Sequence, residues 1–162
     1  MNRIETRLEH LGLTLPPAKS PIANYVLTKR AGKLLFVAGR VSDLTGIAGD
    51  TVSADAAKQA ARDTMLDLLA IIRAQIGSLD RVLSVVSMQG FVRSSRDFMG
   101  LPVVIDGASD LLVALYGAAG QHARTATGVC QLPFGAVVQL NMVMEIDDSQ
   151  VEQLSKWEAM NL

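Results

Sequence analysis

The stretch ADAAKQAARDTMLDLLAIIRAQI, residues 54–76, decides the fold because it predicts one long amphipathic helix. Its apolar residues recur at the i, i+3, i+4, i+7 spacing of a single helix face, while Lys58, Arg62 and Asp67 fall outside that stripe. Ser53 precedes it as a good N-cap, and Gly77 ends the pattern. We therefore expect a helix that covers one face of a sheet.

Segments with strand character lie on both sides of this helix. The two that precede it are joined by a short turn containing Gly32, which predicts a hairpin. The last segment alternates between a continuous apolar face and a mixed face that includes Gln139. The middle segment is apolar on both faces, which implies burial on both sides. The predicted strands are residues 25–30, 34–42, 81–92, 124–130 and 136–146.

A second main helix is predicted over residues 109–116, with Ser109 as its N-cap, and short helices are predicted at 2–12 and 149–160. The order β-β-α-β-α-β-β predicts an α+β fold with two main helices on one face of a five-stranded sheet. One domain over residues 1–162 is expected, with its core at about 20–146. The mixed face of the last strand keeps enough apolar area to favour contact with another subunit.

Composition argues against several classes of partner. The net charge is −1 and the 15 lysines and arginines are scattered, so no nucleic-acid partner is expected. No window approaches 18 uninterrupted apolar residues, and the first residues carry charge where a signal peptide would be apolar. The single cysteine, Cys130, is expected to be a buried thiol in a strand. Together these features predict a cytoplasmic protein without a membrane partner.

Several common site motifs are missing from the sequence. It contains no GxGxxG, Walker, CxxC, HExxH or GxSxG pattern. The two histidines, His10 and His122, lie far apart in sequence, so no metal centre is expected.

Arg124 is the unusual residue that remains, because it opens a strand of small and apolar residues. The plain interpretation is a surface or interface ion pair. The functional interpretation is a guanidinium fork that binds a carboxylate through two hydrogen bonds.

Two groups of residues resemble motifs of the RidA/YjgF family of reactive-intermediate deaminases, also known as L-PSP proteins. The C-terminal signature of that family is matched by Arg124-Thr125, Val129 and Leu132-Pro133, followed by Gln139. Its N-terminal motif is matched by Asn24-Tyr25-Val26 and Phe36-Val37-Ala38-Gly39-Arg40. The resemblance covers about residues 20–146 and is typical of a longer-chain branch of the family.

The resemblance implies a chorismate-mutase-like fold and a homotrimer with ligand clefts between subunits. In deaminating members, the arginine clamps the substrate carboxylate, and a glutamate at position 139 handles the water that hydrolyses an enamine or imine. The products are ammonia and a 2-keto acid, and no cofactor is required. The implied catalytic positions are Arg124 and Gln139, and the implied substrate-binding positions are Tyr25, Ala38, Gly39, Arg124 and Thr125.

This sequence departs from the family pattern at Gln139, which replaces the glutamate, and at Ala38, which replaces a serine. Glutamine cannot accept a proton at neutral pH, and positioned acid–base catalysis contributes roughly 10²–10⁴-fold. Weak hydrolysis is therefore expected, unless Asp106, Asp110 or a backbone carbonyl substitutes. Three hypotheses stay open: a deaminase (a hydrolase), a non-catalytic carboxylate-binding trimer, and an L-PSP-type endoribonuclease or translation inhibitor, which the missing basic patch disfavours.

Overall fold

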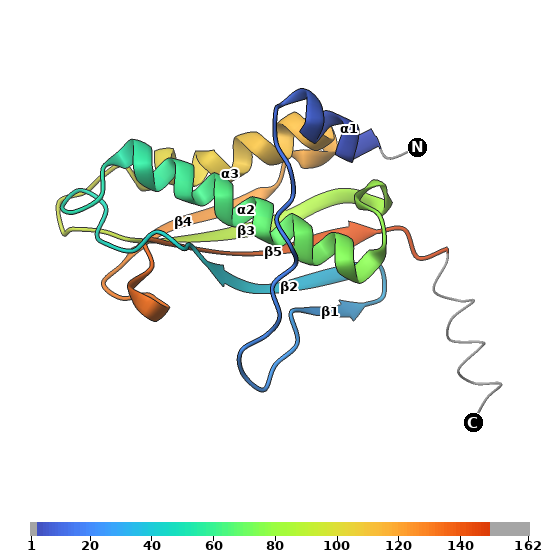
Figure 1. Cartoon of the computed structure of the whole chain (residues 1–162), viewed down its shortest axis with the longest axis horizontal. Helices are drawn as coiled ribbons and strands as arrows, with labels where there is room; N and C mark the ends of the chain where they lie inside the picture. The colour runs from blue at the N-terminus through green and yellow to red at the C-terminus, as the bar shows by residue number, and fades with distance from the viewer. Residues whose placement is uncertain (1–2, 150–162) are drawn as a thin grey trace.

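Five strands form one mixed sheet in the computed structural model, which describes residues 3–149 (Figure 1). The strand order is β1-β2-β5-β3-β4, so β5 is central and β4 lies at an edge. β3 and β4 are parallel, and the other neighbours are antiparallel. The main elements are α1 (Arg3–His10), β1 (Thr28–Ala31), β2 (Leu34–Val41), α2 (Ala54–Ile76), β3 (Val82–Arg93), α3 (Leu101–Tyr116), β4 (Ala123–Val129) and β5 (Val138–Ile146).

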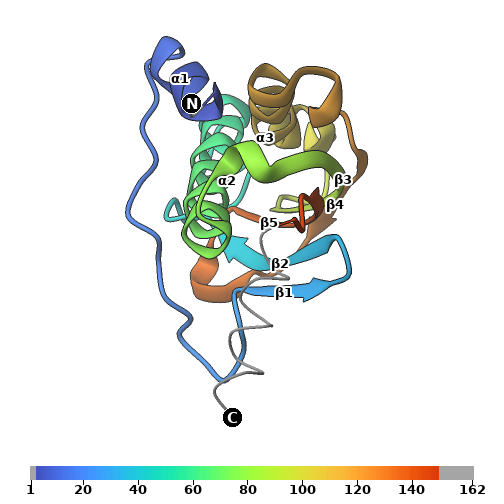
Figure 2. The same ribbon diagram turned by 90° about the vertical axis from the view of Figure 1, so that its right-hand side faces the viewer.

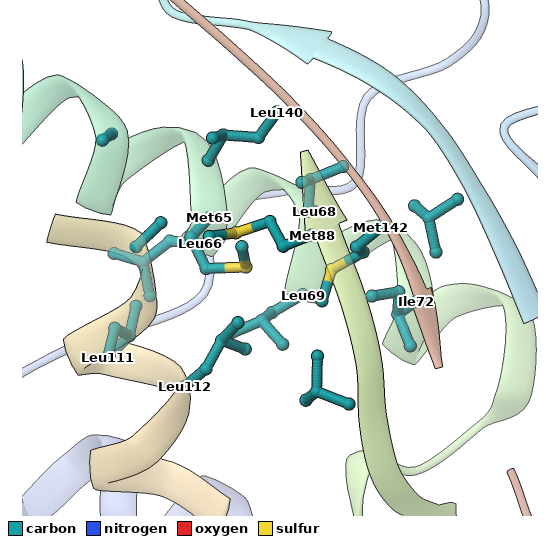
Figure 3. Close-up of a cluster of buried hydrophobic side chains, with 14 of the residues drawn as sticks. Met65, Leu66, Leu68, Leu69, Ile72, Met88, Leu111, Leu112, Leu140 and Met142 are labelled. Atoms are coloured by element: carbon teal, nitrogen blue, oxygen red, sulfur yellow. The ribbon is translucent and has the colours of Figure 1, made fainter. Parts of the chain in front are cut away.

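The two long helices, α2 and α3, cover the same face of the sheet (Figures 1 and 2). The apolar stripe of α2 meets the inward side chains of β3 and β5, and α3 closes the core from beside it (Figure 3). Leu68, Met88, Leu140 and Met142 are almost completely buried there. The predicted α+β class, with two main helices on one face of a five-stranded sheet, is confirmed.

Helix α2 has the predicted bounds. Its N-cap Ser53 accepts a hydrogen bond from the backbone N–H of Ala56 at 3.1 Å, and Gly77 follows its end with a positive φ of 84°. These two caps satisfy backbone groups that the helix itself leaves unpaired. The helix therefore begins and ends where Ser53 and Gly77 predicted.

Helix α3 begins earlier than the predicted start at Ser109, and that prediction was wrong. The helix starts at Leu101, with Pro102 in its first turn, where the missing N–H costs nothing. Position 107 of the helix requires glycine, because the Cβ of any other residue would lie 2.1 Å from the carbonyl oxygen of Lys58 in α2. Ser109 therefore lies in the middle of α3 and is not its N-cap. Its side chain points toward β4, where it contacts His122 and Arg124.

Strand β1 begins at Thr28, three residues later than predicted, because its pairing with β2 extends only from Thr28 to Ala31. Strand β4 ends at Val129, so the expectation that Cys130 is a buried strand residue was also wrong. Cys130 is exposed, since β4 has a single neighbouring strand and the chain leaves the sheet before the cysteine. The predicted closing helix at 149–160 extends outside the described residues.

The face of the sheet opposite the helices is open and partly apolar. The prediction that β3 is buried on both sides was wrong, because α2 and α3 cover only one face of the sheet. Leu83 and Val86 are 48% and 42% exposed, and Phe36 of β2 is 45% exposed. This open face contains large apolar side chains that the single chain does not cover.

The connector between α1 and β1 runs along the outer side of α2 (Figures 1 and 2). Lys19 anchors it through ion pairs with Asp67 of α2 at 2.9 Å and with Asp43 at 3.0 Å. Burial lowers the pKa of Lys19, but its hydrogen bonds to Asp67 and Asp43 outweigh that effect and leave the pKa above its ordinary value.

Among residues 3–149, one segment, Leu101–Gly120, is long and apolar enough by length and composition to cross a membrane. In the fold it is α3 and the turn after it, and α3 packs on α2, β3 and β4. Core helices of soluble proteins commonly satisfy the same two criteria, so this observation is weak evidence for a span.

Candidate functional site

Arg124 lies on the side of β4 that α3 covers. It is paired in register with Met88, whose side chain points into the core. Its Nη1 donates to Asp106 Oδ1 at 2.6 Å and to Ser109 Oγ at 3.2 Å, and both residues belong to α3. The side chains of Arg124 and Asp106 are 26% and 38% exposed, so this ion pair is accessible to solvent. The ion pair foreseen from the sequence is therefore present.

Only one nitrogen of the Arg124 guanidinium makes these contacts. Within residues 3–149, Nε and Nη2 have no hydrogen-bond partner. Two N–H groups on one planar edge match the geometry of a carboxylate. The side chain can therefore keep its bond to Asp106 and still offer a fork to a ligand.

His122 joins this group through Ser109. Its Nε2 lies 3.1 Å from Ser109 Oγ, and its Nδ1 lies 2.7 Å from the carbonyl oxygen of Gly120. Ser109 thus contacts both the imidazole and the guanidinium. Sequence reasoning considered His122 as a metal ligand or as the histidine of a Ser-His-Asp triad, set both aside, and missed this pairing with Ser109. The available signal was its position two residues before Arg124, which places both on one side of an extended segment.

Gln139 lies on the opposite, open face of the sheet. It pairs in register with Val41 of β2 and Phe91 of β3, and its neighbours Val138 and Leu140 are the ones that point into the core. A Cβ added to Gly39 would lie 3.1 Å from Gln139 Nε2, so the amide lies directly over that glycine. The structure brings together these two predicted site residues.

The other predicted site residues are divided between these two places. Thr125 pairs with Gln89, whose side chain accepts a hydrogen bond from Asn141, so it belongs with the open face. Ala38 adjoins Gly39 at the bulge of β2. Tyr25 is exposed ahead of β1, and within residues 3–149 it makes no hydrogen bond to Arg124 or Gln139. One chain therefore does not bring Arg124 and Gln139 into a single cleft.

Both carboxylates considered as substitutes for the missing glutamate are engaged in ion pairs. Asp106 binds Arg124, and Asp110 lies 3.7 Å from Lys58 of α2. The part of the chain that the structure describes holds no group of three or more metal-ligating side chains. A hollow of about 390 Å³ between α2 and α3 is lined by Lys58, Arg62 and Asp110, but neither Arg124 nor Gln139 lines it.

A family model described as "YjgF/chorismate mutase-like, putative endoribonuclease" matches residues 5–146. The chain belongs to the YjgF family. The match spans both the Arg124 side and the Gln139 side of the sheet, and the family resemblance drawn from the motifs is confirmed.

Similar proteins include one curated relative and several solved structures. This YjgF-family chain is 37% identical to Protein TCP17 of Trypanosoma cruzi over 90% of its length and 96% of that protein. It is 38% identical to Atu1372 from Agrobacterium tumefaciens, with a TM-score of 0.83, over 89% of this chain and 92% of that one. A structure called "a putative endoribonuclease" from Shewanella oneidensis is 26% identical, with a TM-score of 0.86, covering 90% and 100% of the two chains.

Proposed function

We propose that this YjgF-family protein is a homotrimer that binds small carboxylate metabolites between subunits, with Arg124 as the carboxylate ligand. The observation that carries this proposal is the free edge of the Arg124 guanidinium, whose Nε and Nη2 have no partner within residues 3–149. A guanidinium held by Asp106 on one nitrogen is positioned in advance for a carboxylate on the other edge.

The division of the site between two faces supports a cleft that needs a second subunit. Arg124 lies at the edge strand, whereas Gln139 and Gly39 lie on the open face. A head-to-tail ring brings two different surfaces of neighbouring copies together, so it can place one copy's edge strand against another's open face. The exposed apolar side chains of that face, including Phe36 and Leu83, give such an interface its buried area.

Within this cleft, the reaction that the carboxylate site favours is hydrolysis of 2-imino or 2-enamino acids to 2-keto acids and ammonia. The endoribonuclease named for some relatives fits this chain less well, because 15 basic residues against 16 acidic ones give it no net positive charge to attract a phosphate backbone.

Titration calorimetry with a 2-keto acid, such as 2-ketobutyrate, tests carboxylate binding. Arg124→Ala is expected to weaken binding by about 10- to 150-fold, the value of charged hydrogen bonds of about 1.5–3 kcal/mol. Arg124→Lys should restore only part of the loss, because an ammonium lacks the planar fork.

Arg73→Ala is the matched control, since Arg73 also forms a half-exposed ion pair, with Glu5 at 3.2 Å, at the far end of α2. It should bind as the native protein does. Equal affinity in the Arg124→Ala and native proteins would reduce Arg124 to a structural ion pair.

A further inference from the structure

Three side chains form a continuous hydrogen-bonded chain on the helix side of β4. His122 Nε2 lies 3.1 Å from Ser109 Oγ, and that same oxygen accepts from Arg124 Nη1 at 3.2 Å. Ser109 and His122 are both half-buried, so this hydrogen-bonded chain of side chains is partly accessible to solvent. The hydroxyl of Ser109 therefore links an imidazole to the guanidinium that we assign to the substrate carboxylate.

The hydrogen bonds fix the chemical roles within this chain. The carbonyl oxygen of Gly120 can only accept, so His122 must carry a proton on Nδ1, which lies 2.7 Å away. In the neutral ring Nε2 then holds the lone pair and accepts from the Ser109 hydroxyl. Arg124 donates to the same oxygen and cannot compete for that proton. A hydroxyl backed by a base, with the base oriented by a third group, is the arrangement that proton-transfer sites use.

We propose that His122 is the base of this protein, acting through the hydroxyl of Ser109 on the water that attacks a 2-imino acid held by Arg124. This inference rests on the proposed carboxylate-binding function. It assigns to the Ser109–His122 pair the proton transfer that Gln139 cannot perform, because a glutamine amide has no proton-accepting form at neutral pH. Histidine is the side chain whose ordinary titration range covers pH 5 to 8.

The reaction needs only water as a co-reactant. The water oxygen forms a bond to the imine carbon, and the C=N π electrons move to nitrogen. Ser109 Oγ takes the proton of the water as its own proton passes to His122 Nε2. The proton then returns by the same route to the amine nitrogen. The hydroxyl proton of the resulting carbinolamine then passes to the amine nitrogen through the same pair. The C=O bond forms as the C–N bond breaks, and ammonia and the 2-keto acid leave without any change of oxidation state.

The test measures binding and turnover separately in four proteins: native, His122→Gln, Ser109→Ala and His10→Gln. His10, on α1, is exposed and serves as the matched histidine control. Keto acid release from a freshly generated imine should fall by about 100-fold or more in His122→Gln and by about tenfold in Ser109→Ala. Calorimetric affinity for 2-ketobutyrate should stay within about twofold of native in the His122→Gln and His10→Gln proteins, because neither side chain contacts the guanidinium of Arg124.

Two further variants separate proton transfer from a structural role. Ser109→Thr keeps a hydroxyl and should retain most of the native rate. His122→Ala should regain activity when imidazole is added to the solution, which a purely structural histidine would not allow.

Hydrolysis at the native rate in His122→Gln, with affinity unchanged, would overturn the proton-transfer assignment and leave the proposed carboxylate binding intact. Native protein that binds 2-ketobutyrate but releases no keto acid would have the same consequence. A native protein that does not bind the keto acid would instead overturn the proposed function, and this inference with it.

Discussion

Strands β5 and β4 carry the two catalytic positions implied by the family resemblance, yet they differ sharply in burial. β5 has a strand on each side and α2 above it, and every second side chain from Val138 to Ile146 is buried. β4 has one neighbouring strand, and none of its seven residues is buried. The chain itself therefore supplies all the neighbours that bury β5, whereas it leaves one edge of β4 unpaired.

The composition of β4 explains what this difference means. Exposed edge strands are usually protected by charges, proline or bulges. The segment Ala123–Val129 has one charged residue, Arg124, and no proline. An unprotected edge beside a partly apolar open face is typical of a surface that another subunit covers, and this comparison leads to the following predictions.

The largest expected effect concerns assembly. Native protein should give a light-scattering mass of about three times 17.3 kDa. Replacing Phe36 and Leu83 together by aspartate places two charges on the open face and should yield a folded monomer, because both side chains are exposed in the single chain. Circular dichroism checks that the fold is retained.

Val113→Asp is the control for this experiment, since Val113 is 40% exposed but lies on α3, away from the open face. It should assemble as the native protein does. A native monomer at micromolar concentration would remove the basis for a site shared between subunits.

The next effect concerns stability and tests the same two strands directly. Leu140→Ala in β5 should lower the free energy of unfolding by about 2–5 kcal/mol, because it leaves a cavity in a fully buried layer. Thr127→Ala in β4 should change it by less than about 0.5 kcal/mol, since that side chain is exposed. Urea unfolding at one fixed protomer concentration measures both values. Similar losses in the two variants would show that assembly buries β4 as deeply as β5.

The same contrast explains which parts of the fold the sequence could predict. The bounds of α2 and the two faces of β5 follow from periodicity, because these elements bury their apolar residues within the chain. The start of α3 was missed since Ser109 looks like an N-cap and Gly107 looks like a helix breaker. The close contact that requires Gly107 is with Lys58, 49 residues earlier in sequence, and local pattern does not reveal it.

The site was less predictable than the fold for a related reason. Motif spacing selects Arg124 and Gln139, but their placement on opposite faces depends on the pairing of β4 and β5 with β3. The contact between Ser109 and His122 depends on how α3 packs on β4. Both facts are tertiary, so a single sequence contains the residues without their arrangement.

The smallest expected effect concerns the position of the missing glutamate. Gln139→Glu restores a carboxylate over Gly39 and should raise keto acid release, but by less than about tenfold. The gain stays far below the full contribution of a general base for two reasons. His122 is already the proposed base, and Ala38 lacks the hydroxyl that the family pattern provides to hold the carboxylate. The measurement compares initial rates of native and Gln139→Glu proteins on the same freshly generated imine.

Asn141→Glu separates a specific effect from an effect of added charge, because it places the same side chain two residues along the same face of β5. Its rate should equal the native rate. A gain of 100-fold or more in Gln139→Glu alone would identify position 139 as the site of the base and would count against His122. Equal rates in all three proteins would show that the open face of β5 does not reach the cleft, and the contrast between β4 and β5 would then concern assembly alone.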